Sequence, residues 1–226
     1  MRENSTHGRD RGKTSETQTN RPSARRAVAL ERVTKRFGAA PVFLNAEMSF
    51  ALGRVHCIMG ASGSGKTTLL RMLMGLETPD EGRIGGMEGL RRAAVFQEDR
   101  LCENLSVAAN IRMPHPQAKG PAKERLLQRA AALLESMDMH DTLHRPVHGL
   151  SGGQKRRVAI ARAVLAEADV MFFDEPLKGL DEKTERRVME AIAPLLAQKT
   201  VFWVTHHASD LAYFDDPVLT RIEKPC

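Results

Sequence analysis

The stretch Gly60-Ala61-Ser62-Gly63-Ser64-Gly65-Lys66-Thr67-Thr68 decides the fold, because it sets a glycine-rich loop between two contrasting segments. Residues 55–59 before it are a short apolar run that suits a buried strand, and residues 66–74 after it have the pattern of a helix ending at Gly75. Strand, glycine loop and helix in this order form the phosphate-binding, or P-loop, pattern. The sequence therefore predicts an α/β protein that binds a phosphorylated ligand.

The residue types in this loop suit a nucleotide with a metal ion. Glycines let the main chain wrap closely around phosphate with its amides pointing inward, and the start of helix 66–74 adds partial positive charge. Lys66 neutralises phosphate as a point cation, and Thr67 offers a hydroxyl to Mg²⁺. We therefore predict that residues 60–68 bind ATP and Mg²⁺. A glycine-rich turn without a ligand is the alternative, and the agreement of motif and context argues against it.

A pair of acids follows a second apolar run, residues 170–173, at Asp174 and Glu175. Two carboxylates at the end of a buried strand are costly unless they meet a cation or solvent. In a P-loop protein the first acid contacts Mg²⁺, and the second can act as a general base on the attacking water. We predict these roles for Asp174 and Glu175. The alternative is that both acids only cap the strand before a turn at Pro176.

A second helix start is marked by Ser151-Gly152-Gly153-Gln154, which reads as a capping box ahead of an apolar-striped helix. Such a start is another anion site, although helix 66–74 already serves the chain's own nucleotide. We therefore expect residues 151–154 to meet the γ-phosphate of a nucleotide held by another copy, which makes the site composite. A simple helix cap is the alternative. We interpret Lys155, Arg156 and Arg157 as a solvated basic face.

The remaining pattern alternates strands with helices, which indicates a parallel α/β core. Residues 98–149 interrupt it as a mostly helical insertion, with an amphipathic helix at about 122–137. We expect turns and a short hairpin over 79–92. The fold prediction is a P-loop NTPase core with a parallel sheet, a small N-terminal antiparallel part and the helical insertion. The predicted strands are 28–33, 47–52, 55–59, 93–96, 169–173 and 200–204, and the predicted helices are 66–74, 152–166, 182–198 and 207–213.

Composition narrows the class of protein. The chain of 226 residues carries a net charge of +6, and residues 1–26 hold seven Lys/Arg against three acids. We expect this tail to be a disordered, solvated extension, with weak attraction to anionic lipid as the alternative, and residues 27–226 to form one domain. The weak charge of that domain argues against nucleic acid. No apolar run reaches the ~18 residues of a membrane span, and no secretory signal opens the chain. Three scattered cysteines indicate reduced thiols in the cytoplasm.

These motifs together resemble the ATP-binding cassette (ABC) family over about residues 28–221, most specifically through Leu150-Ser-Gly-Gly-Gln-Lys-Arg-Arg-Val-Ala-Ile-Ala-Arg. The resemblance implies that Phe37 stacks on adenine, with packing in the core as its alternative. It implies that Gln97 senses Mg²⁺ and links the site to the insertion, and that Glu175 is the catalytic base. It further implies that Asp181 lies in a loop crossing a dimer interface and that His206 contacts the γ-phosphate. Two departures from the family pattern are His207, where an acid is usual, and Lys178-Gly179, where small residues are usual.

The resemblance implies an ATPase subunit of an importer at the cytoplasmic face of the membrane. Its partners would be a second cassette, identical or paralogous, separate transmembrane permease subunits and, indirectly, a solute-binding protein. Residues 95–101 look similar to ATPases that import nitrate, sulfonate, taurine or thiamine-like solutes. The alternatives are an ABC ATPase of DNA repair or translation, an ATP-dependent docking module, and a small-molecule P-loop kinase. An ABC ATPase of DNA repair or translation would need a long coiled coil, a zinc hook or tandem cassettes, and this sequence contains none of them. A small-molecule kinase would lack the signature stretch that this sequence contains.

Overall fold

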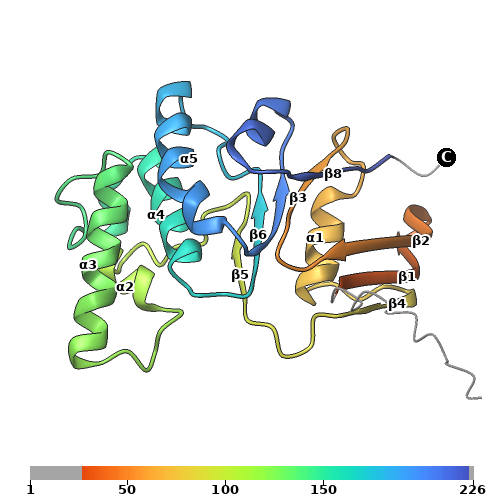
Figure 1. The fold of residues 1–226 in the computed structure, drawn as a ribbon, viewed down its shortest axis with the longest axis horizontal. Helices are drawn as coiled ribbons and strands as arrows, with labels where there is room; N and C mark the ends of the chain where they lie inside the picture. Colours follow the sequence, from red (N-terminus) through yellow and green to blue (C-terminus); the bar gives the residue numbers. More distant parts are fainter. Residues whose placement is uncertain (1–26, 224–226) are drawn as a thin grey trace, which may run out of the picture.

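In the computed structural model of the protein, residues 27–223 are described, so the predicted basic tail and Cys226 lie outside the described residues. Two sheets and a set of helices make up the described chain (Figure 1). A three-stranded antiparallel sheet lies at one end, a five-stranded parallel sheet in the middle, and the helical insertion at the other end. The predicted fold class is confirmed. No helix within residues 27–223 combines the length and apolar character needed to cross a bilayer.

The parallel sheet is the centre of the fold. Its strands run in the order β5-β6-β7-β3-β8, with bounds β3 Val55–Met59, β5 Arg92–Val95, β6 Val170–Asp174, β7 Thr200–Val204 and β8 Val218–Arg221. All residues of β6 and β7 are buried. Because side chains alternate across a strand, Met171 and Phe173 join the core beneath α4 and α5, while Val170 and Phe172 join the core beneath α1. This burial on both faces explains why β6 is apolar up to its last residue.

The antiparallel sheet has the order β2-β1-β4, with β1 Ala27–Phe37, β2 Ala40–Ala51 and β4 Glu81–Gly85. The expectation of a separate hairpin within residues 79–92 is wrong, because β4 pairs with β1 instead. Close approach of these strands explains the glycines there. Gly82 has a φ of +82°, and a Cβ on it would lie 2.2 Å from the carbonyl oxygen of Arg32. Strands β1 and β2 also extend beyond the predicted segments and meet at a turn over residues 38–39.

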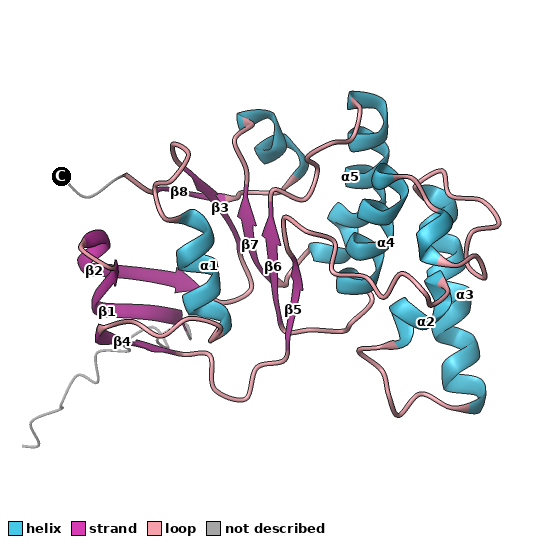
Figure 2. Cartoon of the chain, turned by 180° about the vertical axis from the view of Figure 1, so that it is seen from behind, coloured by secondary structure: helices cyan, strands magenta, loops and turns pink. Residues whose placement is uncertain are grey.

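Helices α1 Lys66–Met74, α4 Gly152–Val164 and α5 Glu182–Leu196 border the parallel sheet. Figures 1 and 2 show α1 on the side of the antiparallel sheet, and α4 and α5 on the other side. The insertion contains α2 Val107–Arg112, α3 Gly120–Ser136 and the short 3-10 turn Val147–Gly149, joined by loops. The predicted apolar stripe of α3 is confirmed, since Leu126, Ala130 and Leu134 are buried. The last predicted helix is a 3-10 segment, Ala208–Tyr213, and strand β8 was not predicted.

Candidate functional site

The P-loop connects the end of β3 to the start of α1, as predicted. Gly65 precedes the helix with a φ of +101°, and a Cβ at this position would lie 2.6 Å from Cγ1 of Val42 in the antiparallel sheet. No side chain caps this helix start among the described residues. The first amides of α1 therefore depend on water or on a bound anion, which is the arrangement that phosphate-binding helices use.

Lys66 is folded into the loop that precedes it. Its Nζ donates to the carbonyl oxygens of Gly60 and Ala61 at 2.8 and 2.9 Å, and the residue is only 6% exposed. Burial lowers the pKa of Lys66, while the nearby carboxylates of Glu175 and Asp174 oppose that change. Two neutral carbonyls do not neutralise a buried ammonium, so an anion in the loop would complete its charge balance.

The end of β6 meets the start of α1 through a hydrogen bond, because the Thr67 hydroxyl donates to Oδ2 of Asp174 at 2.9 Å. Asp174 is 4% exposed, and its Oδ1 has no hydrogen-bond partner within residues 27–223. Burial raises the pKa of this carboxyl. A hydroxyl beside a buried carboxylate with an orphan oxygen fits a hard cation such as Mg²⁺. Among the described residues no cluster of three His, Cys, Asp or Glu could hold a metal alone, so phosphate oxygens would complete such a site.

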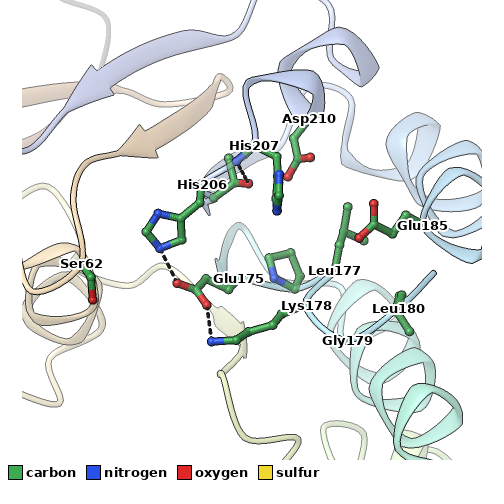
Figure 3. Close-up of a pocket in the computed structure, with 12 residues that line it drawn as sticks. Ser62, Glu175, Leu177, Lys178, Gly179, Leu180, Glu185, His206, His207 and Asp210 are labelled. Carbon is green, nitrogen blue, oxygen red and sulfur yellow. Dashed lines mark hydrogen bonds and ion pairs between the residues drawn. The ribbon is translucent and has the colours of Figure 1, made fainter. Parts of the chain in front are cut away.

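The carboxylate of Glu175 is held by two nitrogen-bearing side chains (Figure 3). Its Oε1 lies 2.7 Å from Nε2 of His206, and its Oε2 accepts from Nζ of Lys178 at 2.9 Å. Burial raises the pKa of Glu175, but the bonds from Lys178 and His206 outweigh it and hold the pKa below its usual value. The side chain is therefore an ionised base at neutral pH. The role of Lys178 was missed, because the sequence analysis noted Lys178 only as a departure from the expected residue type.

Glu175 and His206 line a cavity of about 420 Å³ whose wall also includes Ser62 of the P-loop. Figure 3 shows Ser62 on the opposite side of Glu175 from Leu180 and Gly179. Glu175 has a φ of +48°, an unfavourable conformation for a residue with a side chain, and its amide donates to the carbonyl of Val204 at 3.0 Å. The structure thus brings the P-loop together with the acid pair and His206, although Thr67 and Asp174 are separated by 107 residues in the sequence.

Ser151 forms the predicted capping box at the start of α4. Its hydroxyl accepts from the Gln154 amide at 3.3 Å, and its own amide donates to the Gln154 side chain at 3.0 Å. Ser151 and Gly152 are exposed, and nothing lies within 4 Å of a Cβ added to Gly152. Within one chain, α1 and α4 lie on opposite sides of the parallel sheet (Figures 1 and 2). The structure therefore does not bring residues 151–154 to the chain's own P-loop.

The other predicted residues lie around this centre. Phe37 is 52% exposed at the end of β1, so its alternative role in the core is excluded. Gln97 is exposed directly after β5, and its carbonyl accepts from Arg156 at 3.3 Å. Asp181 caps α5, accepting from the Thr184 amide at 3.0 Å. The roles of Phe37, Gln97 and Asp181 toward a ligand or partner stay predictions.

The interpretation of residues 155–157 as a solvated face is wrong for Arg156, which is 4% exposed. Its guanidinium donates to the main chain beyond β5 and beyond β6. Sequence reasoning missed the burial of Arg156 because a run of basic residues beside a polar helix start is typical of a solvent-exposed surface. Its spacing of three and four residues before the apolar residues Ala159 and Ile160 of α4 was a weak signal of burial.

The sequence matches the family described as ABC transporter over residues 43–178, more than half of the chain. The iron(III) import ATP-binding protein FbpC of Photorhabdus laumondii is 37% identical over 203 residues, 85% of this chain and 58% of that protein. The spermidine/putrescine import ATP-binding protein PotA of Treponema pallidum is 34% identical over 203 residues, 85% of this chain and 53% of that protein. The chain thus spans little more than half the length of these relatives.

Two solved structures have similar folds. The dimeric structure of MJ0796, a bacterial ABC transporter cassette, superposes with a TM-score of 0.74 and 26% identity, covering 86% of this chain and 94% of that one. A dimeric post-hydrolysis state of the same cassette, bound to ADP and inorganic phosphate, has a TM-score of 0.73 and 27% identity, covering 87% and 97%.

Proposed function

Because this chain belongs to the ABC transporter family, we propose that it is the ATP-hydrolysing subunit of a membrane importer, in which two cassettes close on ATP. The observation that carries this proposal is the separation of two phosphate-type helix starts. The start of α1 contacts the acid pair through Thr67, whereas the start of α4 is exposed across the sheet. Each chain therefore offers one half of each of two composite sites. The dimeric relative and the relatives named as import proteins support this arrangement.

Nucleotide binding is assigned to residues 60–68 together with Phe37. The exposed Phe37 ring would stack on adenine, and the amides of α1 with Lys66 would bind the phosphates. Mg²⁺ would be held by Thr67, Asp174 and Gln97, and when bound it supplies positive charge to the phosphate oxygens.

Hydrolysis is assigned to Glu175 as general base. The carboxylate accepts a proton from the attacking water while the bond between the γ-phosphorus and its bridging oxygen breaks, giving ADP and inorganic phosphate. Each carboxylate oxygen accepts one hydrogen bond in this structure and has a second lone pair that can accept the proton of the attacking water. We assign to His206 a turn toward the γ-phosphate when nucleotide binds, while Lys178 keeps the carboxylate ionised.

Closure is assigned to the second cassette, identical or paralogous. Its residues 151–154 would meet the γ-phosphate, and its Asp181 would lie at the interface. The γ-phosphate then supplies the differential affinity that drives closure. The helical insertions would follow and move separate permease subunits, with the cassettes bound at the cytoplasmic face of the membrane and a solute-binding protein acting indirectly.

The solute class is proposed from residues 95–101 alone, whose resemblance favours a small anion, a sulfonate or a thiamine-like compound. The relatives described above are named for iron(III) and for polyamines. Uptake by the reconstituted transporter with each of these solutes would decide between the classes, since uptake of iron or polyamine alone would contradict our proposal.

The composite site is tested by ATP hydrolysis of the purified chain over a wide range of protein concentration, with Lys66→Ala as the inactive control. We expect the rate per chain to rise with concentration and then to saturate, because two chains must associate before either site is complete. A rate per chain that stays constant at high dilution would contradict the sandwich.

A further inference from the structure

Arg156 joins two segments that carry functional residues. It lies on α4, is 4% exposed, and directs its guanidinium at the chain beyond β5 and beyond β6. At the end of β6 and just beyond it, Arg156 contacts the carbonyl oxygens of Asp174 at 3.2 Å, Glu175 at 2.6 Å and Pro176 at 2.7 Å. Its contacts beyond β5 are the carbonyls of Phe96 and Gln97, the latter at 3.3 Å, and Oδ1 of Asp99 at 3.1 Å.

The sheet explains why these carbonyls need a donor. Strands β5 and β6 are neighbours, and their pairing ends at Val95 and Phe173. Beyond that point the two segments of the chain no longer bond to each other, so their buried carbonyls require hydrogen-bond donors from elsewhere. A planar guanidinium with five N–H groups can serve both segments at once, whereas a lysine offers three donors and a glutamine two.

The contact with Glu175 bears on the catalytic side chain. Glu175 has a φ of +48°, which is unfavourable for a residue with a Cβ, and such conformations persist only where surrounding bonds over-determine them. Two hydrogen bonds fix the backbone of Glu175 on both sides of its Cα. Its amide donates to the carbonyl of Val204, and its carbonyl accepts from Arg156. This backbone conformation directs the carboxylate toward His206.

We infer that Arg156 is a positioning residue that ties the Gln97 segment to the backbone of Glu175, so that the two segments move as one unit. The inference rests on the proposed function, because it concerns the base assigned there. Residues 98–149 continue directly from the Gln97 segment, and a displacement of the insertion therefore reaches Glu175 through one guanidinium. Arg156 couples the insertion to the alignment of the base without touching the substrate.

Arg162 on the same helix provides a matched control. It donates to the carbonyls of Arg100 at 2.9 Å and Asp99 at 3.1 Å, so it anchors the segment beyond β5. It makes no hydrogen bond to residues 174–176 within the described chain. Replacing Arg162 removes comparable arginine-to-carbonyl bonds from α4 but leaves the Glu175 carbonyl bonded to Arg156.

The experiment compares Arg156→Lys, Arg156→Gln and Arg162→Gln in the full chain. We expect both Arg156 variants to lower kcat for ATP at least about tenfold, since misplacing a catalytic group by about 1 Å can cost about a hundredfold. We expect KM to change less than about twofold, because the P-loop is untouched. Arg162→Gln should keep kcat within about twofold of the wild-type value, even if its melting temperature falls as much as that of the Arg156 variants. Arg156→Lys keeps the buried positive charge and so guards against a variant that does not fold.

Hydrogen exchange gives a second readout that needs no ATP turnover. In Arg156→Lys the Glu175 amide should exchange faster than in the wild type. The Cys102 amide, which lies in the segment beyond β5 and donates to Oδ1 of Asn110 on α2, should also exchange faster. In Arg162→Gln only the Cys102 amide should exchange faster. Normal kcat in Arg156→Lys, or unchanged exchange at Glu175, would overturn the inference. A wild-type chain without ATPase activity would overturn the proposed function instead, and the exchange experiment would still decide the role of Arg156.

Discussion

The two helices that begin at phosphate-type motifs satisfy their first turns in different ways. The start of α1 has no side-chain cap, and Lys66 folds back onto the loop before it. The start of α4 has a complete capping box, in which Ser151 and Gln154 bond each other's amides. An uncapped start keeps its amides for an anion, whereas a capped start must give up part of its cap to bind one. The difference supports our proposal that α1 binds a nucleotide within one chain and that α4 meets the nucleotide of a partner.

Glu175→Gln has the largest expected effect among the tests of this comparison, because it stops ATP hydrolysis without altering either helix start. We expect ATP hydrolysis to fall by roughly 10²–10⁴-fold, the range for loss of a general base. Both helix starts would then stay on the unhydrolysed nucleotide, and a dimer should accumulate with ATP but not with ADP. Size-exclusion chromatography with light scattering measures that dimer. Normal hydrolysis in this variant would show that Glu175 is not the base.

Lys66→Ala should affect the α1 site alone. Loss of charge-assisted bonds to phosphate is expected to cost about 3 kcal/mol, or roughly a hundredfold in nucleotide affinity. A fluorescent ATP analogue titrated into dilute protein measures it, since a single chain already holds this site. Arg71→Ala, at the other end of α1, is the control and should bind normally. Unchanged affinity in Lys66→Ala would mean that the α1 start does not hold the nucleotide.

Both helix starts were predictable from the local sequence, whereas the long-range contacts of α4 were not. Strand, loop and helix around residues 60–68 are contiguous, so the local pattern contained the whole start of α1. The capping box at Ser151 was equally local, and it is confirmed. Burial of Arg156 depends on Phe96 and Asp99, about sixty residues away, which no pattern around α4 contains. Strand β4 was misassigned for the same reason, because its partner β1 lies about fifty residues earlier.

Strand β8 was missed for a different reason. Three of its four residues are exposed at the edge of the parallel sheet, so the sequence lacks the apolar run that marks β6 and β7. The contact of Lys178 with Glu175 was missed because a lysine in a loop after a strand has no local pattern that fixes its rotamer. The P-loop and the acid pair were predictable because burial and main-chain geometry restrict them, while the long charged side chains around them are positioned by tertiary contacts.

Ser151→Asp sharpens the comparison at the α4 start. Aspartate caps a helix about as well as serine, so the stability of the isolated chain should change little. A carboxylate facing the γ-phosphate of the partner's nucleotide would repel it, and ATP-dependent dimerisation of Glu175→Gln should weaken by roughly tenfold or more. Nucleotide affinity of the dilute single chain should stay the same. A dimer as tight as that of Glu175→Gln alone would exclude residues 151–154 from the composite site.

Ser151→Ala has the smallest expected effect and separates the two roles of this side chain. In the isolated chain the lost cap should lower the free energy of unfolding by about 1 kcal/mol, because the Gln154 amide loses its acceptor. For a chain of this size that corresponds to a fall of roughly 2–4 °C in melting temperature, measured by thermal denaturation. Ser106→Ala, which removes the side-chain cap of α2 in the insertion, is the matched control at a helix start that carries no glycines. If serine only caps the helix, both variants should dimerise with ATP equally well in the Glu175→Gln background. If α4 meets the partner's phosphate, only Ser151→Ala should weaken that dimer, and by less than Ser151→Asp, since alanine removes a donor without adding a charge.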